Sequence, residues 1–160
     1  MASHTATIVW VNDGEFGSGR YSRAHEWRFD GGAVVRGSSS PLVVPEPLSN
    51  ASAVDPEEAL TASASSCHML WFLSLAQKAG FNVQSYRDEA VGTVGKDDRG
   101  RIAVTRIALR PDILFSSRTP SRDELARLHH EAHEKCFIAN SLRSEIVVEP
   151  SGTPGSQSGS

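Results

Sequence analysis

The sequence predicts an α+β fold. Alternating apolar and polar residues mark strands within residues 6–36 and again between residues 83 and 115, and two long segments with helix-capping signals separate or follow these strands. A chain of 160 residues and 17.2 kDa fits one domain, which we place at residues 1–150. Residues 151–160 are low-complexity Gly, Ser and Pro, and we expect them to be disordered.

The first fifty residues are expected to form three strands and an irregular connection. Apolar residues alternate with polar ones over residues 6–10 and 25–29, which is the period of a half-buried strand. Asp30 and the two glycines after it supply a hairpin turn into a third strand at residues 33–36. The serine- and proline-rich stretch 37–52 cannot easily continue a ladder, so it predicts an irregular connection or lid.

The clearest local signal predicts a long helix over residues 55–78. Asp55 is an N-cap acid, Pro56 suits the first helical position, and Gly80 ends the pattern. From residue 59 to residue 76 the helix is small or apolar nearly all the way round. A helix without a polar stripe must be covered on every side, so in a domain of this size we expect a partner chain to cover part of it.

Two strands, a second helix and a last strand complete the expected order. Residues 83–94 and 102–115 are read as two strands joined by a charged, glycine-containing turn, which makes a second hairpin. Ser121 and the glutamate three residues later have capping-box spacing, and they begin a helix that we expect to run over residues 122–139. Residues 143–149 are expected to form a last short strand.

Composition narrows the partners and the compartment. The chain carries 16 basic and 19 acidic residues, for a net charge of −3, and its cations are scattered, so we expect no nucleic-acid partner. The N-terminus lacks a basic segment followed by an apolar one, and the longest apolar-rich run, residues 69–76, is shorter than the ~20 residues of a membrane span. We therefore expect a soluble, cytoplasmic protein without a membrane partner. In that compartment a disulfide would form transiently during a reaction and would not be a structural cross-link.

Two cysteines, Cys67 and Cys136, lie 69 positions apart and have no zinc-finger spacing. Either one alone is best explained as an inert core residue, because free cysteine packs as a small hydrophobe. As a pair they fit thiol chemistry, in which a low-pKa thiol reacts and a second thiol resolves its sulfenic acid. His68 points about 100° away from Cys67 on a helix, so it is a poor candidate for its base.

The segment DPEEALTASASSCHM resembles the start of the central helix in the OsmC/Ohr family, in which a reactive cysteine follows the first glutamate by ten positions, as Cys67 follows Glu57. HEKCFIAN resembles the family's second cysteine motif, usually Cys-Pro-x-Ser followed by a polar residue. The resemblance covers about nine-tenths of the chain. It implies an OsmC-like fold of mainly antiparallel sheets packed around a long central helix, in an intertwined homodimer. Phe137 replaces the family proline, which indicates a divergent OsmC-like subfamily whose substrate or activity can differ.

The resemblance also implies thiol-dependent reduction of organic hydroperoxides. By position, Cys67 would be the peroxidatic cysteine, Cys136 the resolving cysteine and Glu57 a carboxylate that orients an arginine. A sulfenic acid on Cys67 would condense with Cys136 to a disulfide, which an external dithiol of the lipoyl or thioredoxin type would reduce. No bound cofactor is expected. The arginine has three candidates, Arg20, Arg23 and Arg36, and we prefer Arg23 because it immediately precedes the second strand.

Two geometric requirements follow for this scheme. Ten helical residues separate Glu57 from Cys67 by ~15 Å, so Glu57 cannot touch the Cys67 of its own chain unless the helix begins later or the partner subunit intervenes. Cys67 and Cys136 need Cα atoms within about 7 Å of each other to form a disulfide.

A second class of function stays open, namely a non-enzymatic OsmC-like dimer that binds a small apolar ligand or a metal in the same cleft. His129 and His133 are four residues apart and Cys136 follows by three, so all three could offer zinc ligands on one helical face. The segment lacks the HExxH pattern, however, and we favour solvated surface histidines. Such a dimer would keep its thiols and consume no hydroperoxide.

Overall fold

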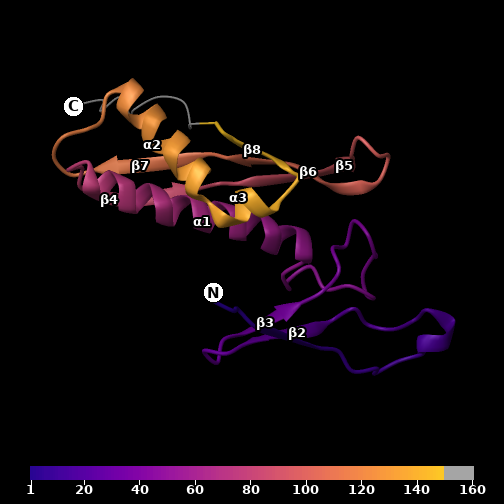
Figure 1. The fold of residues 1–160 in the computed structure, drawn as a ribbon. Helices are drawn as coiled ribbons and strands as arrows, with labels where there is room; N and C mark the ends of the chain where they lie inside the picture. Colours follow the sequence, from indigo (N-terminus) through magenta and orange to yellow (C-terminus); the bar gives the residue numbers. More distant parts are fainter. Residues whose placement is uncertain (150–160) are drawn as a thin grey trace, which may run out of the picture. The chain divides into compact units, whose positions relative to one another are not determined.

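The computed structural model describes residues 1–149 and confirms the predicted α+β class, with helices and mainly antiparallel strands (Figure 1). These residues form two units, Met1–Ala59 and a second that begins at Leu60, and each is described by itself. The predicted disorder of residues 151–160 concerns a segment outside the described residues.

The first unit contains a three-stranded antiparallel sheet. Its strands are β1 (Ala6–Val9), β2 (His25–Phe29) and β3 (Val34–Gly37), in the order β1-β2-β3, and a short 3-10 helix, η1 (Phe16–Ser18), lies in the loop after β1. Trp27 pairs with Ile8 on one side and with Val35 on the other. Gly32 adopts φ +87° in the β2–β3 turn, a conformation that an L-residue with a side chain rarely adopts. Residues 38–55 carry no helix or strand, as their serines and prolines predict.

Helix α1 (Pro56–Lys78) has the predicted boundaries and the predicted cap. The Asp55 carboxylate accepts the Glu58 N–H at 2.8 Å, while the Glu58 carboxylate accepts the Asp55 N–H at 3.1 Å. This reciprocal pair satisfies two of the free N–H groups at the helix start. Gly80, at φ +80°, ends the helix because it takes up the left-handed conformation common after helix C-termini.

The length and composition of α1 would allow it to cross a membrane, a property that the core helix of a soluble protein shares. Its alanines and the absence of charged residues from position 59 to position 77, together with the apolar run, account for this hydropathy over a stretch longer than residues 69–76. Ala64, His68, Phe72 and Ala76 are its buried residues, and their spacing of four places them on one face.

The predicted second hairpin is divided between two sheets, which corrects the two uninterrupted strands expected from the sequence. The four strands are β4 (Val83–Asp88), β5 (Val91–Lys96), β6 (Ile102–Leu109) and β7 (Pro111–Phe115), with β4 paired to β7 and β5 to β6. At the division, the Asp88 carboxylate accepts the Arg110 N–H at 2.6 Å, and Pro111 has no N–H to give. Local side-chain chemistry therefore interrupts a ladder that hydrophobic alternation alone would continue.

The second predicted helix is also interrupted. It forms α2 (Arg122–Lys135) and a short α3 (Phe137–Ser141), separated by Cys136 at φ −70° and ψ 110°. The capping box at Ser121 and Glu124 is present as predicted. The last strand, β8 (Glu145–Val148), pairs parallel to β6.

The core of the second unit has two parts. Helices α1 and α2 cover the β4–β7 pair, with Phe72 and Ala76 of α1 packed against Leu128 and Ala132 of α2 (Figure 1). The other part joins α1 to β6 through a second set of buried side chains: Ala64, Ile107 and Leu109. These contacts fix the middle of α1, which carries Cys67.

Candidate functional site

Cys67 and Cys136 meet in the second unit. Cys67 is half-buried in the middle of α1, and Cys136 is 1% exposed at the α2–α3 junction. Their side chains lie close enough for Cys67 to influence the ionisation of Cys136, and both cysteines are free thiols. Packing of α1 against α2 therefore brings together two thiols that are 69 positions apart in the sequence.

Cys136 has a structural task as well. It is the C-terminal cap of α2 and the N-cap of α3, and its sulfur accepts the Ala139 N–H at 3.4 Å. Phe137 is consequently the first residue of α3, a position at which proline is favoured because its missing N–H would have no partner there. The departure from the Cys-Pro-x-Ser motif thus replaces one acceptable first residue by another and leaves the break at Cys136 in place.

Burial raises the pKa of the Cys136 thiol to about 11, and the neighbouring Cys67 adds to the rise, while the Ala139 N–H works against it. A thiolate is the nucleophilic form of cysteine. Cys136 is therefore held as a protonated thiol at neutral pH.

A pair of buried histidines links the same two helices. Nε2 of His68 lies 3.0 Å from Nδ1 of His129, and the rings are stacked with centroids 5.3 Å apart. His68 is 1% exposed and His129 is 6% exposed. Burial lowers the pKa of each imidazole to about 4, so both are neutral near pH 7. In the sequence, His68 stands out only as a neighbour of Cys67, and no local pattern indicates its pairing with His129.

The zinc hypothesis finds no support in this arrangement. His129 faces His68 in the interior, where its Nδ1 atom lies 3.0 Å from Nε2 of His68. Within residues 1–149, no three side chains of His, Cys, Asp or Glu come together in a way that could hold a metal ion. His129 is also buried, which corrects the expectation that it is a solvated surface histidine. The reason is its stacking on Phe72, with ring centroids 4.5 Å apart.

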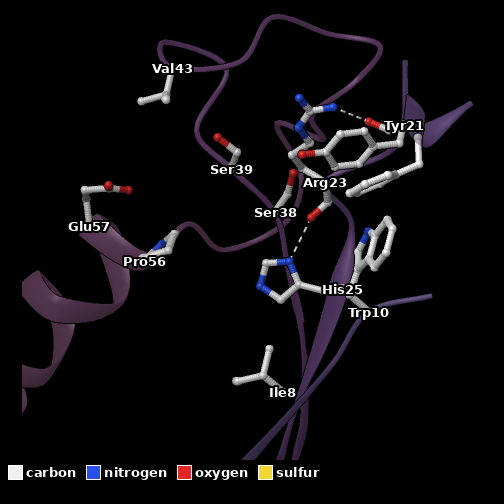
Figure 2. Close-up of a pocket in the computed structure, with 11 residues that line it drawn as sticks. Ile8, Trp10, Tyr21, Arg23, His25, Ser38, Ser39, Val43, Pro56 and Glu57 are labelled. Carbon is white, nitrogen blue, oxygen red and sulfur yellow. Dashed lines mark hydrogen bonds between the residues drawn. The ribbon is translucent and has the colours of Figure 1, made fainter. Parts of the chain in front are cut away.

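A cavity of ≈ 490 Å³ lies in the first unit (Figure 2). Apolar and aromatic side chains dominate its lining, together with a few polar groups. The lining residues are Ile8, Trp10, Phe16, Tyr21, Arg23, His25, Ser38, Ser39, Val43, Pro56 and Glu57. An apolar cavity with few polar groups is typical of sites for small organic ligands. A second, more polar cavity of ≈ 790 Å³ in the second unit includes neither cysteine.

Three aromatic rings form one wall of the first cavity. The centroids of Trp10, Phe16 and Tyr21 lie 4.8 to 5.8 Å from one another. The Trp10 indole N–H donates to the Ser22 carbonyl at 2.8 Å, which fixes the orientation of this ring in the wall. None of these rings was assigned to a site from the sequence. Strand alternation explained Trp10, and the glycine-containing stretch 12–23 was expected to be a loop of the kind in which function often lies, without a particular ring being singled out.

Arg23 is held at several points beside this wall. Its guanidinium carbon lies 3.7 Å from the centroid of the Tyr21 ring, and the same group donates to the Tyr21 carbonyl and, at 3.2 Å, to the Gly19 carbonyl. Its backbone N–H donates to the Leu48 carbonyl at 2.8 Å. Of the three candidate arginines, Arg23 lines the cavity, whereas Arg20 forms an exposed ion pair with Glu15.

Glu57 lines the same cavity from the first turn of α1. Because α1 begins at Pro56 and is continuous through Lys78, Glu57 and Cys67 are ten residues apart on one helix, a rise of about 15 Å. The later helix start that would have relaxed this distance does not occur. Glu57 and Arg23 thus belong to a pocket of the first unit, and the two thiols belong to the second.

The sequence model of a family described as OsmC-like protein matches residues 49–151. The chain is 49% identical to an OsmC-like protein of unknown function from Vibrio cholerae, with a TM-score of 0.91 over 94% of this chain and 99% of that chain. It shares 18% identity and a TM-score of 0.68 with an organic hydroperoxide resistance protein from Elizabethkingia anophelis, over 94% of each chain.

A similar protein from Bacillus subtilis, also an organic hydroperoxide resistance protein, is 17% identical with a TM-score of 0.62, over 92% of this chain and 98% of that chain. At such low identity these two likenesses concern the fold alone. No curated protein matched the chain. The family match over residues 49–151 and the 49% identical structure together show that the chain belongs to the OsmC-like protein family.

Proposed function

We propose that this protein is a thiol-dependent peroxidase that reduces organic hydroperoxides. The observation that carries the proposal is the contact between Cys67 and Cys136, because a peroxide-reducing thiol needs a second thiol within reach. Membership of a family whose relatives include organic hydroperoxide resistance proteins supports the choice of substrate. The first-unit cavity, with its aromatic wall, offers an apolar surface for the organic group.

The reaction has three steps. The Cys67 thiolate attacks one peroxide oxygen, so that an S–O bond forms, the O–O bond breaks, and the alcohol leaves after taking up a proton. Cys136, after losing its proton, attacks the sulfur of the Cys67 sulfenic acid, which forms the disulfide and releases water. An external dithiol of the lipoyl or thioredoxin type then reduces the disulfide and is itself oxidised.

Arg23 and Glu57 complete the proposed machinery. A guanidinium close to a thiol favours the thiolate, and it can also donate to the peroxide oxygen that becomes the leaving group. Glu57 would orient the guanidinium. The proposal requires Arg23 to approach a Cys67 thiol, either of its own chain or of its partner.

A homodimer is part of the proposal because α1 keeps an uncovered face. Ala62, Ser66 and Leu70 are exposed, and their spacing of four places them on one side of the helix. Leu70, the large apolar residue on this side, is 61% exposed. Small residues let two helices approach closely, so a second copy of α1 is a suitable partner for this face. We expect the dimer to work in the cytoplasm, where a dithiol reductant is present.

The direct test follows the loss of cumene hydroperoxide with a dithiol reductant. Cys67→Ser should abolish turnover, while Cys136→Ser should give one turnover and accumulate a sulfenic acid that dimedone traps. Arg23→Lys should lower kcat/KM because it removes the planar, bidentate donor. Arg20→Lys is the matched control and should retain wild-type rates, since Arg20 is exposed and lies outside the cavity lining.

Two results would overturn the peroxidase proposal. One is undiminished turnover by Cys67→Ser, and the other is a wild-type protein that consumes no hydroperoxide with any of several dithiols. The second result would favour the alternative function, a non-enzymatic dimer that holds a small apolar ligand in the ≈ 490 Å³ cavity. Native mass spectrometry of the purified protein would then detect the retained ligand.

A further inference from the structure

Two side chains of β2 form a hydrogen-bonded relay that ends on Arg23. His25 and Trp27 are two residues apart, so they lie on the same face of the strand. The Trp27 indole N–H donates to Nε2 of His25 at 2.8 Å. On the other side of the ring, Nδ1 of His25 lies 2.7 Å from the Arg23 carbonyl oxygen (Figure 2). Nothing in the proposed chemistry uses either side chain directly.

The partners of the imidazole define its tautomer. An indole N–H can only donate, so Nε2 of His25 must accept and carries no hydrogen. A carbonyl oxygen can only accept, so Nδ1 must carry the hydrogen and donate to Arg23. Both ends of the ring therefore require the same form of His25, the neutral Nδ1–H tautomer.

Gly37 makes room for this relay. It pairs with His25 across the β2–β3 ladder and is buried. A Cβ atom at this position would lie 2.5 Å from Nε2 of His25 and 2.7 Å from the Trp27 indole nitrogen, closer than real Cβ atoms come. The glycine thus leaves space at the hydrogen bond that determines the tautomer, although its φ is not in the left-handed region.

We propose that Trp27 and His25 are positioning residues that hold the Arg23 backbone, and with it the guanidinium in the cavity. His25 fixes the Arg23 carbonyl, while Leu48 fixes the Arg23 N–H from the other side. Trp27 acts one step further out, by keeping the donor of His25 on Nδ1. Because Arg23 serves the peroxide in the proposed function, the effect on catalysis rests on that function, whereas the tautomer does not.

The first experiment needs no activity. The protein is labelled with ¹⁵N-histidine, and long-range ¹H–¹⁵N spectra are recorded at pH 8, with the His25 signal among the six histidines identified by its loss in His25→Asn. Wild type should show the Nδ1–H tautomer, and Trp27→Phe, which keeps a ring but loses the N–H, should shift His25 toward the Nε2–H form. A wild-type signal typical of Nε2–H, or an unchanged signal in Trp27→Phe, would overturn the proposal.

The second experiment uses matched variants for activity. His25→Leu should lower kcat/KM by about three- to tenfold, the usual effect of losing one net hydrogen bond, while His25→Asn should recover most of it because its side-chain N–H replaces Nδ1–H. Gly37→Ala should lower kcat/KM and alter the His25 signal. Gly31→Ala should change neither, since a Cβ at Gly31 would have no atom within 4 Å.

The two experiments fail separately. A wild-type protein that consumes no hydroperoxide contradicts the proposed function. The tautomer of His25, measured in the first experiment, then decides whether the relay exists. Equal rates in His25→Leu and wild type, in a protein that is an active peroxidase, would show that His25 does not position Arg23. Circular dichroism and the melting temperature of each variant identify any loss of folding, and the wild-type spectrum decides the tautomer even where a variant does not fold.

Discussion

Acid should destabilise the second unit through the buried pair His68 and His129. Protonation of either ring is costly because neither is solvated, and Nδ1 of His68 is buried without a hydrogen-bond partner. Burial of the pair costs least free energy when His68 donates from Nε2 to His129. Nδ1 of His68, which has no hydrogen-bond partner, then carries a lone pair and not an N–H group. Of the charged groups around His68, Asp88 raises its pKa and His133 lowers it, but burial is the largest cause and the net pKa is about 4.

The sign follows from proton linkage. Unfolded histidine has a pKa near 6.5, so between about pH 6.5 and pH 4 the unfolded chain binds more protons than the folded one, and stability falls as the pH falls. With folded pKa values of about 4, lowering the pH from 6 to 5 should cost roughly 1 kcal/mol for each histidine, or about 2 kcal/mol for the pair. For a chain of this length that is about 4–8 °C in melting temperature.

The assay is urea unfolding at pH 6 and pH 5 at one protein concentration. His129→Gln removes one of the two buried imidazoles and should lose about half of this acid sensitivity. His130→Gln is the matched control, because the neighbouring His130 side chain is 74% exposed and should leave the sensitivity unchanged. If His129→Gln and His130→Gln respond to acid alike, the buried pair does not control stability and the reasoning is refuted.

Three further predictions concern packing and thiol reactivity. Gly92→Ala should destabilise the protein because the added Cβ would overlap Oγ1 of Thr61. Thr61→Ala in the same chain should restore part of the loss, which a double-mutant cycle would measure. Leu109 is 0% exposed, so Leu109→Ala should lower the free energy of unfolding in urea by about 2–5 kcal/mol. Leu114 is 54% exposed, so Leu114→Ala should lower it much less. Equal losses would contradict the assigned core. Iodoacetamide at pH 8 should alkylate Cys136 slowly in the folded protein and rapidly in urea. With a pKa of about 11, roughly one Cys136 side chain in a thousand is a thiolate at this pH. Fast labelling of the native protein would contradict the protonated state of Cys136.

The local signals in the sequence were sufficient for most of the elements. The Asp55-Pro56 start and the Gly80 stop predicted α1 with its observed boundaries, because capping and left-handed termination depend on neighbouring residues only. The predictions were wrong where one residue changed the path of a longer element. Pro111 and Asp88 divide a hairpin, and Cys136 divides a helix, although hydrophobic periodicity continues across all three positions.

The candidate site shows the same contrast. The motifs selected Cys67, Cys136 and Glu57, and the position before the second strand favoured Arg23 over Arg20 and Arg36. The structure brings the two cysteines together and places Glu57 and Arg23 around one cavity. The relay through His25 and the His68 pair were missed. His25 and Trp27 do share a strand face in the sequence pattern, which could have suggested contact between them, but no pattern shows that a carbonyl and an indole meet the same imidazole.

The sequence by itself determined most of the elements, the family and the residue types available for chemistry, because caps, turns and the spacing of Glu57 and Cys67 are local properties of the chain. Only the tertiary structure decided which of those residues meet. The packing of α1 against α2 brings Cys67 close to Cys136, and it buries His129 against Phe72. Burial and long-range contact depend on how distant segments pack, and these in turn set the protonation states on which the proposed chemistry relies.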